Sequence, residues 1–316
     1  MNSDIKLSII VPYHNEADEV IFPLFNSINN QIDINFNDIE IIVSNNCETP
    51  VPPKSLFDGT FPNIQSRIKY VTPIIKNISG ASRQFGVDRS VGEYLMFCDD
   101  DDYLPTIDIL HHIIGIASQH KDIDVFRFYE NIQNEDLSFR KVFSRDVLIH
   151  GKIFSSNFIK KNKITFSNTL DVAEDNYYCN HVFAYKPKIL DYDKIIYVFR
   201  YNPNSVSRRL GDKFTLMCQK NICVGISDLM KKIIADENAP QEYAFRYLLR
   251  ALSETTLVEK LALHTAANLI FTYDPNFKWL NGKYPTTGGA DAQNRVMPFV
   301  QKALLITAEE SSKHND

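Results

Sequence analysis

The sequence has few cysteines, and none of them forms a CxxC pair. The five cysteines are odd in number and scattered: Cys47, Cys98, Cys179, Cys218 and Cys223. This pattern argues against a disulfide framework and against a structural zinc site, both of which need paired or closely spaced cysteines. It is typical of a protein that works in a reducing cytoplasm.

Long apolar runs are also missing from the sequence. No stretch approaches the roughly 18 to 20 apolar residues that a membrane-spanning helix needs. The opening residues, MNSDIK, lack the charged and apolar segments of a signal peptide and lead directly into an apolar, β-rich run. We therefore expect a cytoplasmic protein, with any membrane contact peripheral and at the inner face of the membrane.

An excess of positive charge is absent as well. The formal net charge is −5 at pH 7, and the sequence has no basic tail. Electrostatics therefore gives no reason to expect nucleic acid as a partner. Hydrophobic residues make up 44% of the 316 positions, which is ample for a packed core in one large domain or in a catalytic domain with a smaller one.

The most informative stretch is FCDDDDYLP, from Phe97 to Pro105. Four consecutive carboxylates, Asp99 to Asp102, follow the apolar run Tyr94 to Phe97, which predicts a buried strand. Carboxylates this close repel one another unless a cation or hydrogen bonds offset the charge, and a hard metal ion suits them. The alternative is a solvated acidic turn that caps a helix beginning near Thr106. The position at a strand's carboxyl end, where open α/β sheets bind ligands, favours a site.

Strand patterns alternate with helical patterns through the first half of the chain. Strands are predicted over residues 7–11, 39–44, 68–71 and 94–98, and helices over residues 16–30 and 81–91. Pro12 is expected to end the first strand, and Ser79 to cap the second helix. Alternation of this kind predicts an α/β fold, with a mostly parallel sheet and helices on both faces.

The pattern changes in the last third of the chain. Before it, we predict strands over residues 124–129, 139–143 and 194–201, and helices over residues 155–161 and after Asp175. From about Gly211 onward, apolar residues recur only at helical spacing. We therefore expect an α/β domain over residues 1–210 and a helical region over residues 211–316, which binds substrate, forms a homo-oligomer or packs on the sheet domain.

Five separated blocks share the order and spacing of one enzyme family. They are LSIIVPYHNE (residues 7–16), IEIIVSNNCET (39–49), GASRQFGVDRSVGEYLMFCDDDDYL (80–104), LDVAEDNYY (170–178) and YVFRYNPNSVSRR (197–209). Together they resemble the family 2 glycosyltransferases with a GT-A fold, of the bacterial surface-glycan type. The third block is the most specific, because it joins the family's arginine helix to its DxD motif, here Asp99-Asp100-Asp101. The resemblance implies that residues 1–210 bind a nucleotide-sugar and carry out catalysis, and that the helical region 211–316 binds the acceptor, forms an oligomer or packs.

The resemblance implies a set of donor-binding residues in these blocks. They are Pro12, Tyr13, Asn15, Glu16, Asn45, Arg83, Asp99, Asp100, Arg200 and Ser205. Tyr13 can stack on the base, and Arg83 can reach the uracil or a phosphate through its planar donors. The alternatives are a Tyr13 packed as ordinary core at a strand end and an Arg83 on a helix surface.

A metal site is implied in the third block. Asp101 would bind Mn2+ or Mg2+ directly, with Asp99 in the same site and Asp100 near the ribose or a metal-bound water. A divalent cation would offset the charge that develops on a diphosphate leaving group. Asp102 either joins this cluster or caps the following helix. His150 and His181 are interpreted as structural, which leaves the third metal ligand open.

The fourth block implies the catalytic base. An inverting transfer needs a base that removes the acceptor hydroxyl's proton while that hydroxyl attacks the anomeric carbon. Asp175 is the candidate, and Glu174 would orient the site or bond the backbone. The alternative is a pair of acids that the helix dipole favours at a helix N-terminus.

The sequence departs from the family at three places. Asn45 stands where the family has an aspartate against the uracil, Gln84 replaces the usual asparagine, and no histidine lies between Tyr197 and Arg209. Asparagine can still accept through its carbonyl oxygen, but it also offers an NH2 group, so base selectivity stays open.

The implied function is a metal-dependent, inverting glycosyl transfer. A hexosyl or N-acetylhexosaminyl group would move from a UDP-sugar to a hydroxyl of a glycan or lipid-linked glycan acceptor in surface polysaccharide biosynthesis. The three departures keep one alternative open: a nucleotide-sugar-binding or scaffolding protein with a degenerate GT-A site.

Overall fold

The computed structural model describes residues 5–144, 146–280, 282–285 and 292–313, without the side chains of residues 209, 292–293 and 307–313. The chain forms two compact units. The first comprises Met1–Asp175 and Pro187–Asn204, and the second comprises Asn176–Lys186 and Ser205–Asp316. Residues 176–186, which the two-part prediction placed with the sheet, group with the C-terminal helices. The roles predicted for the two parts stay predictions.

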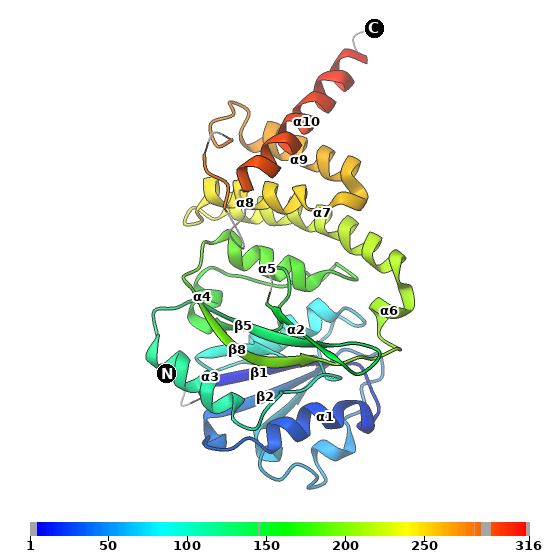
Figure 1. The fold of residues 1–316 in the computed structure, drawn as a ribbon, viewed down its shortest axis with the longest axis vertical. Coiled ribbons are helices and arrows are strands. Elements are labelled where there is room, and N and C mark those ends of the chain that lie inside the picture. Colours follow the sequence, from blue (N-terminus) through cyan, green and yellow to red (C-terminus); the bar gives the residue numbers. More distant parts are fainter. Residues whose placement is uncertain (1–4, 145, 281, 286–291, 314–316) are drawn as a thin grey trace. The chain divides into compact units, whose positions relative to one another are not determined.

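The first unit is built on an eight-stranded sheet with the order β3-β2-β1-β4-β7-β5-β6, in which β8 also pairs with β5 (Figure 1). The strands are β1 (Leu7–Tyr13), β2 (Ile39–Asn45), β3 (Ile68–Val71), β4 (Tyr94–Phe97), β5 (Val125–Gln133), β6 (Phe139–Phe143), β7 (Lys152–Ser155) and β8 (Ile189–Phe199). β1 pairs in parallel with β2 and β4, and β2 with β3, whereas β7 runs antiparallel between β4 and β5. The carboxyl ends of β1, β2 and β4 therefore lie at one edge, and the predicted mostly parallel, mixed sheet is confirmed.

Helices cover both faces of this sheet. They are α1 (Asp18–Asn29), α2 (Ser79–Arg89), α3 (Ile109–Gln119) and α4 (Ser156–Lys161). Ile9 of β1 belongs to the core cluster that contains Leu24 of α1 and Ile113 of α3. Ile10 points to the opposite face, where a Cβ added to Gly86 of α2 would lie only 2.5 Å from Ile10 Cγ2. The uninterrupted apolar run of β1 is thus explained, because both of its faces are buried.

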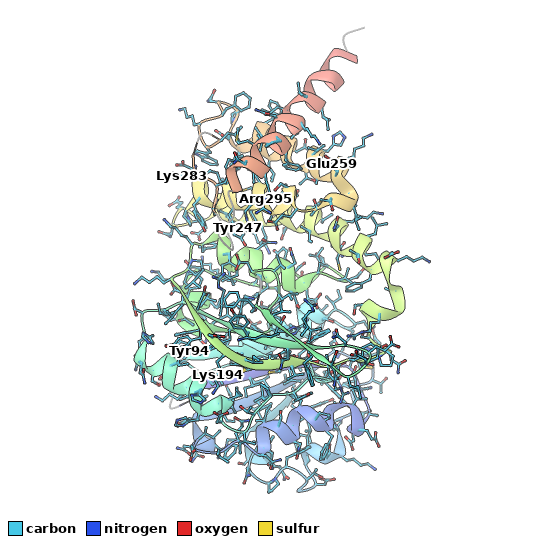
Figure 2. All side chains as sticks on the ribbon, in the orientation of Figure 1. Tyr94, Lys194, Tyr247, Glu259, Lys283 and Arg295 are labelled. Atoms are coloured by element: carbon cyan, nitrogen blue, oxygen red, sulfur yellow. The ribbon has the colours of Figure 1, made fainter. Side chains whose placement is uncertain are left out.

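Two side-chain hydrogen bonds connect α3 and the residue before it to the sheet. Tyr94 of β4 donates a hydrogen bond to the carbonyl oxygen of Ala117 in α3, at 3.0 Å (Figure 2). Lys194 of β8 donates to Asp108, which precedes α3, at 3.2 Å. These bonds connect α3 to β4, which leads to the acidic stretch, and Asp108 to β8.

Several predicted boundaries are wrong, among them the start of β8, which lies at Ile189 and not at residue 194, and the end of β5, which lies at Gln133 and not at residue 129. β1 continues through Pro12, because β4 has already ended there and the missing N–H of proline faces no strand on that side. Ser79 is the first residue of α2 and not its cap, and Ile78 precedes it without a capping side chain. α3 begins at Ile109, later than predicted.

One strand was not predicted at all. β7 has only four residues and pairs antiparallel with β4 on one side and β5 on the other. A strand this short gives little periodicity to detect, and its pairing partners are far away in the sequence. Its position matters because the residues before it lie at the edge where β4 ends.

The second unit is helical within its described residues, as predicted for the last third of the chain. Its helices are α5 (Glu174–Ala184, from Asn176 on), α6 (Val206–Leu210), α7 (Asp212–Ala235), α8 (Gln241–Ser253), α9 (Glu259–Tyr273) and α10 (Ala292–Lys313). Tyr177 of α5 donates to Asp228 of α7 at 2.5 Å and accepts from Lys232 at 2.6 Å. Two turns further on, Tyr185 donates to Asp236 at 2.8 Å. None of the helices in the described part of the chain has the length and apolarity to span a membrane.

Candidate active site

Three of the sequence blocks meet at one edge of the sheet. β1 ends at Tyr13 and β2 at Asn45, and these two residues are paired in the parallel register. The acidic stretch begins at Asp99, just after β4, where the Cys98 N–H still donates to Ile10 of β1 at 3.1 Å. Strand order alone therefore gathers the donor loop, the second block and the acidic stretch.

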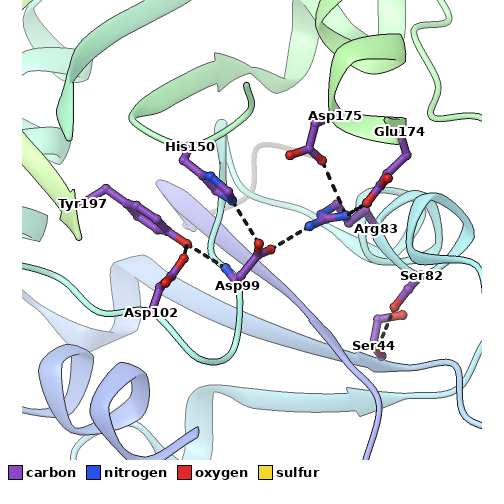
Figure 3. Close-up of polar contacts among 9 residues, drawn as sticks. All are labelled: Ser44, Ser82, Arg83, Asp99, Asp102, His150, Glu174, Asp175 and Tyr197. Carbon is purple, nitrogen blue, oxygen red and sulfur yellow. Dashed lines mark hydrogen bonds and ion pairs between the residues drawn. The ribbon is translucent and has the colours of Figure 1, made fainter. Parts of the chain in front are cut away.

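Arg83 links the acidic stretch to the ED pair (Figure 3). From α2, its Nη2 donates to Asp99 Oδ1 at 2.6 Å and its Nη1 donates to Glu174 Oε1 at 2.5 Å. Asp175 Oδ1 lies 3.5 Å from the same Nη1. Only 5% of the Arg83 side chain is exposed. Burial alone would lower the pKa of Arg83, but the surrounding carboxylates raise it well above its usual value, so the guanidinium stays charged.

His150 binds the other oxygen of Asp99. Its Nε2 lies 3.1 Å from Asp99 Oδ2, and its ring stacks on Tyr197 with the centroids 4.7 Å apart and the planes 5° from parallel. Burial opposes a charge on this ring, but Asp99 raises the pKa of His150 to about 10. The same two cations, Arg83 and His150, overcome the effect of burial on Asp99 and hold the pKa of its carboxyl below the usual range.

Asp102 connects the acidic stretch to the end of β8 through hydrogen bonds. It is 1% exposed, accepts a hydrogen bond from the Tyr197 hydroxyl at 2.5 Å and accepts another from the Arg200 backbone N–H at 2.7 Å. The Tyr197 hydroxyl in turn accepts from the Asp99 N–H at 2.9 Å. The alternative that Asp102 caps the following helix is wrong, because Asp108 precedes α3 and Asp102 is committed to β8.

Neither of the two middle carboxylates, Asp100 and Asp101, forms an ion pair within the described part of the chain. Asp101 accepts a hydrogen bond from Asn202 Nδ2 at 2.7 Å and forms no ion pair with any described residue. Burial raises the pKa of Asp101. Burial and the neighbouring Glu16 carboxylate raise the pKa of Asp100 well above its usual value, and Asp100 Oδ2 is buried without a hydrogen-bond partner in the described part of the chain. Extra positive charge near these two groups would stabilise both of them.

Two sets of side chains offer ligands for a divalent cation. One ligand atom each from Asp99, Asp102 and His150 lie within 4.8 Å of one another, and carboxylate oxygens with an imidazole nitrogen suit Mn2+. In that group, however, Asp99 is already paired with Arg83. Asp101 stands outside the group and offers oxygens of the kind that Mg2+ and Mn2+ prefer. The chemistry of the acidic stretch thus fits a divalent cation by either route.

The donor loop is held by its own side chains. Tyr13 is 4% exposed, belongs to the core cluster and donates its hydroxyl hydrogen to the Glu16 carbonyl at 2.8 Å. Glu16 also accepts from the His14 N–H at 2.6 Å through its carboxylate. Pro12 lies half-buried at the end of β1. This arrangement matches the alternative in which Tyr13 packs as core at a strand end.

The side-chain amide of Asn45 forms hydrogen bonds with other groups of the protein. It is completely buried, donates to Asn15 Oδ1 at 2.6 Å and to the Tyr70 hydroxyl at 2.8 Å, and accepts from the Cys47 N–H at 2.9 Å. Asn15 also accepts from the Val51 N–H at 2.9 Å and has a φ of 63°, a left-handed conformation that asparagine tolerates. The two residues therefore join the donor loop to the loop after β2.

The ED pair sits at the start of α5. Glu174 and Asp175 are the first two residues of that helix, where the dipole favours negative charge. Burial is the main cause that raises the pKa of Glu174. Ala173, just before the pair, has a φ of 64°, which is uncommon for a residue other than glycine, asparagine or aspartate. Contacts with the rest of the first unit must therefore hold this turn.

Arg200 and Ser205, the donor-binding candidates of the fifth block, belong to different units. Arg200 lies beside the acidic stretch through its backbone bond to Asp102. Ser205 belongs to the second unit, where its Oγ accepts from Arg208 at 3.3 Å and lies 3.2 Å from Ser207 Oγ. The donor contacts predicted for both residues stay predictions.

Sequence reasoning missed His150 and Tyr197 as partners of the acidic stretch. Extending the antiparallel register of β4 and β7 beyond the pair Met96–Ile153 places His150 opposite Asp99. The signal was therefore present once β7 was recognised. Tyr197 carried no such signal, because its role depends on the parallel pairing of β8 with β5.

Comparison with known sequences finds one family. The sequence profile described as Glycosyl transferase family 2 matches residues 8–186, more than half of the chain. A curated relative from Bacillus spizizenii, poly(ribitol-phosphate) beta-glucosyltransferase, is 27% identical over 211 residues, which are 60% of this chain and 32% of the relative. The chain thus spans about a third of the length of that relative.

Solved structures share the fold. TarS 1-349 from S. aureus in complex with UDP-GlcNAc superposes with a TM-score of 0.60 at 18% identity, covering 95% of this chain and 82% of that one. The mannosyltransferase PcManGT from Pyrobaculum calidifontis, in complex with GDP-Man and Mn2+, gives a TM-score of 0.54 at 15% identity, covering 95% and 87%. These neighbours are glycosyltransferases with the GT-A fold, so the predicted fold class is confirmed.

Proposed function

The chain belongs to glycosyl transferase family 2, and is thus a glycosyltransferase, and we propose that it moves a sugar from a UDP-sugar to an acceptor hydroxyl with inversion. One observation carries this proposal: Arg83 brings the acidic stretch and the ED pair within a single buried ion-pair network. A donor held at the first and a base held at the second would face one another across a few ångströms. Membership of the family favours this reading over the binding-protein alternative.

Asp175 is the proposed base. It heads α5, and its carboxylate lies 3.5 Å from Arg83 Nη1, further away than the 2.5 Å of Glu174. The longer contact leaves Asp175 available to take the proton of the acceptor hydroxyl, while Glu174 anchors the pair. The acceptor oxygen, losing its proton to that base, then attacks the anomeric carbon from the side opposite the diphosphate as the bond to the diphosphate breaks, which inverts the configuration.

Asp101 is the proposed direct ligand of Mn2+ or Mg2+. Asp100 and Asp101 are both partly exposed and form no ion pair among the described residues, whereas Asp99 and Asp102 are engaged by Arg83 and Tyr197. Of the first two, Asp100 lies beside the Glu16 carboxylate, and Asp101 accepts from the neutral Asn202. When bound, such an ion offsets the charge of the departing diphosphate. Asn202, which donates to Asp101, orients the carboxylate for this role, and His150 keeps Asp99 ionised.

The donor and acceptor classes are proposed from the relatives. The TarS structure contains UDP-GlcNAc, and the Bacillus relative is named for transfer to poly(ribitol-phosphate). We propose a UDP-hexose or UDP-N-acetylhexosamine donor, with Asn45 shaping the loops of the base pocket. The acceptor is a hydroxyl of a glycan, polyol-phosphate polymer or lipid-linked glycan of the cell surface.

Thermal-shift titration tests the donor and the metal together. UDP with Mn2+ is expected to raise the melting temperature, because a ligand that binds only the folded state stabilises it by about 2.7 kcal/mol at a hundred times its Kd. Asp101→Ala should abolish the shift. Asp122→Ala is a matched control, since Asp122 is 72% exposed and pairs only at 3.4 Å with Lys188. A larger shift with GDP, or one independent of Mn2+, would contradict the donor or the metal proposal.

A transfer assay tests the base. Asp175→Asn should slow transfer by about 10²- to 10⁴-fold, the usual worth of a general base, while the UDP-dependent shift persists. NMR of the product should show the anomeric configuration opposite to that of the donor. Retained configuration would rule out the proposed single displacement.

A further inference from the structure

We infer that Arg83 is a positioning residue for the transfer step, which holds the ED pair in place from α2 and does not contact the donor nucleotide. The inference rests on the proposed function, because it concerns the same reaction. It differs from the role that the family resemblance implied, in which Arg83 reaches the uracil or a phosphate.

Both terminal nitrogens of the guanidinium bind protein carboxylates, whereas Nε is buried without a hydrogen-bond partner among the described residues. One terminal nitrogen donates to Asp99 and the other to Glu174, with Asp175 next to the latter (Figure 3). The side chain is 5% exposed, so carboxylates of the protein, and not solvent, surround its terminal nitrogens. Arg83 therefore links Asp99, after the carboxyl end of β4, to Glu174 at the start of α5, and we call this link the brace.

Gly80, one turn earlier on α2, brings the backbone of the ED segment close enough for this brace. A Cβ added to Gly80 would lie 2.2 Å from the Ser167 carbonyl oxygen and 3.1 Å from Glu174 Cβ. The first contact is impossible for a real side chain, so residue 80 has to be glycine for the segment to pack there. At this separation the guanidinium group of Arg83 can donate to the Glu174 carboxylate.

Gln84 completes the contact on the same face of α2. Its Oε1 accepts a hydrogen bond from the Phe166 N–H at 2.9 Å. Residues 80, 83 and 84 are spaced i, i+3 and i+4, so they line one face of the helix. This face of α2 contacts the segment 166–175 through residues 80, 83 and 84. The bond to Phe166 gives a reason for glutamine at position 84, where the family usually has asparagine.

The segment needs that support. Ala173 adopts a φ of 64°, a strained conformation that persists only when the surroundings hold it. The ED pair follows directly, so any relaxation of Ala173 would swing the base away from the acceptor. Misplacement by about 1 Å costs about a hundredfold in rate.

Arg83→Lys is the variant that tests the inference. Lysine keeps the charge, but one ammonium cannot bond Asp99 and Glu174 with the geometry of a planar fork. We expect kcat to fall about a hundredfold, with the KM for donor and the UDP-dependent thermal shift unchanged. Arg89→Lys is the matched control and should leave all three unchanged, because Arg89 is exposed on the same helix and lies over the Phe85 ring at 3.8 Å.

A double-mutant cycle shows whether Arg83 acts through Glu174. If it does, Arg83→Lys combined with Glu174→Gln should lower kcat little more than the more damaging single change, since both remove the same brace. Gly80→Ala is the second probe, and it displaces the segment without touching a charge. It should reproduce the loss of kcat with UDP binding intact.

The outcomes separate the two proposals. A raised donor KM and a lost UDP shift in Arg83→Lys, with kcat preserved, would show that Arg83 contacts the nucleotide and overturn the inference while leaving the proposed function standing. Additive effects of Arg83→Lys and Glu174→Gln on kcat would also overturn it. A wild-type protein that neither binds UDP nor transfers sugar would overturn the proposed function, and the inference with it.

Discussion

Replacing Glu40 by glutamine should destabilise the first unit substantially, although Glu40 lies outside the site. Its carboxylate is buried on β2 and accepts three hydrogen bonds: from Ser8 Oγ at 2.5 Å, the Val91 N–H at 2.7 Å and Lys69 Nζ at 2.5 Å. The carboxylate therefore joins β1, β2, β3 and the loop before β4. Glutamine keeps the size of the side chain, so the change isolates the charge.

The expected loss is about 3 kcal/mol at pH 7. The bonds from Ser8 and Val91 both reach Oε1, and each weakens from about 2 to about 1 kcal/mol when its acceptor becomes neutral. The pair with Lys69 is lost, because a glutamine NH2 would face the ammonium group. Lys69 is 50% exposed, so that pair adds no more than about 1 kcal/mol.

The loss should depend on pH in a defined direction. Burial alone would raise the pKa of Glu40, but the bonds from Lys69, Ser8 and Val91 lower it below its ordinary value of 4.5. Its contribution is therefore complete above pH 4.5 and is lost as the pH falls through the lower, folded-state pKa. The difference between wild type and Glu40→Gln should shrink over that same range.

Urea unfolding followed by far-UV circular dichroism at neutral and acidic pH measures this difference. Trp279 is the one tryptophan and lies in the second unit, so its fluorescence reports that unit separately. Glu93→Gln is the matched control, because Glu93 is 35% exposed and its pair with Lys6 spans 3.1 Å; it should cost under about 1 kcal/mol. An equal loss in both variants, or a pH-independent loss in Glu40→Gln, would refute the reasoning.

Three further changes test other features of the structure. Gly86→Ala should cost about 1–3 kcal/mol by overpacking against Ile10, and Ile10→Ala should relieve part of it in a double variant; additive costs measured by urea unfolding would contradict the close approach. Tyr197→Phe should cost about 2 kcal/mol and weaken the Mn2+-dependent UDP shift, because the hydroxyl bonds Asp102 and the Asp99 N–H; an unchanged shift would separate Tyr197 from the site. Asn45→Asp should lower the melting temperature, since a carboxylate oxygen would face Asn15 Oδ1, and an undiminished melting temperature with a larger UDP shift would show that Asn45 reads the base.

Much of the first unit could be predicted from the sequence, because its signals are local. The apolar runs before Tyr13, Asn45 and Asp99 predicted buried parallel strands, and the structure places all three ends at one edge. Because the ends of parallel strands meet, the acidic stretch and the donor loop could be predicted to share a site. The order of the blocks predicted the family.

The contacts inside the site could not be predicted in the same way. Whether Arg83 faces a nucleotide or Glu174 depends on how closely α2 packs on the segment before α5, and no local pattern reports that distance. His150 stayed hidden because β7 is too short to be recognised by periodicity. Asp102 was predicted either to join the acidic cluster or to cap a helix, and neither prediction included the hydrogen bond that a tyrosine far along the chain donates to it.

The turn between β5 and β6 is a place where the chain can change in length without disturbing the sheet. β5 runs antiparallel to β7, which is antiparallel to β4, so the tip at residues 134–138 projects from the same edge as the acidic stretch. Bonds within the tip close it, such as that from the Asn134 N–H to the Ser138 carbonyl oxygen, and Leu137 is 66% exposed. Insertions there leave every strand register intact. A longer turn here would therefore extend the protein beside the acidic stretch without changing the strands that position it.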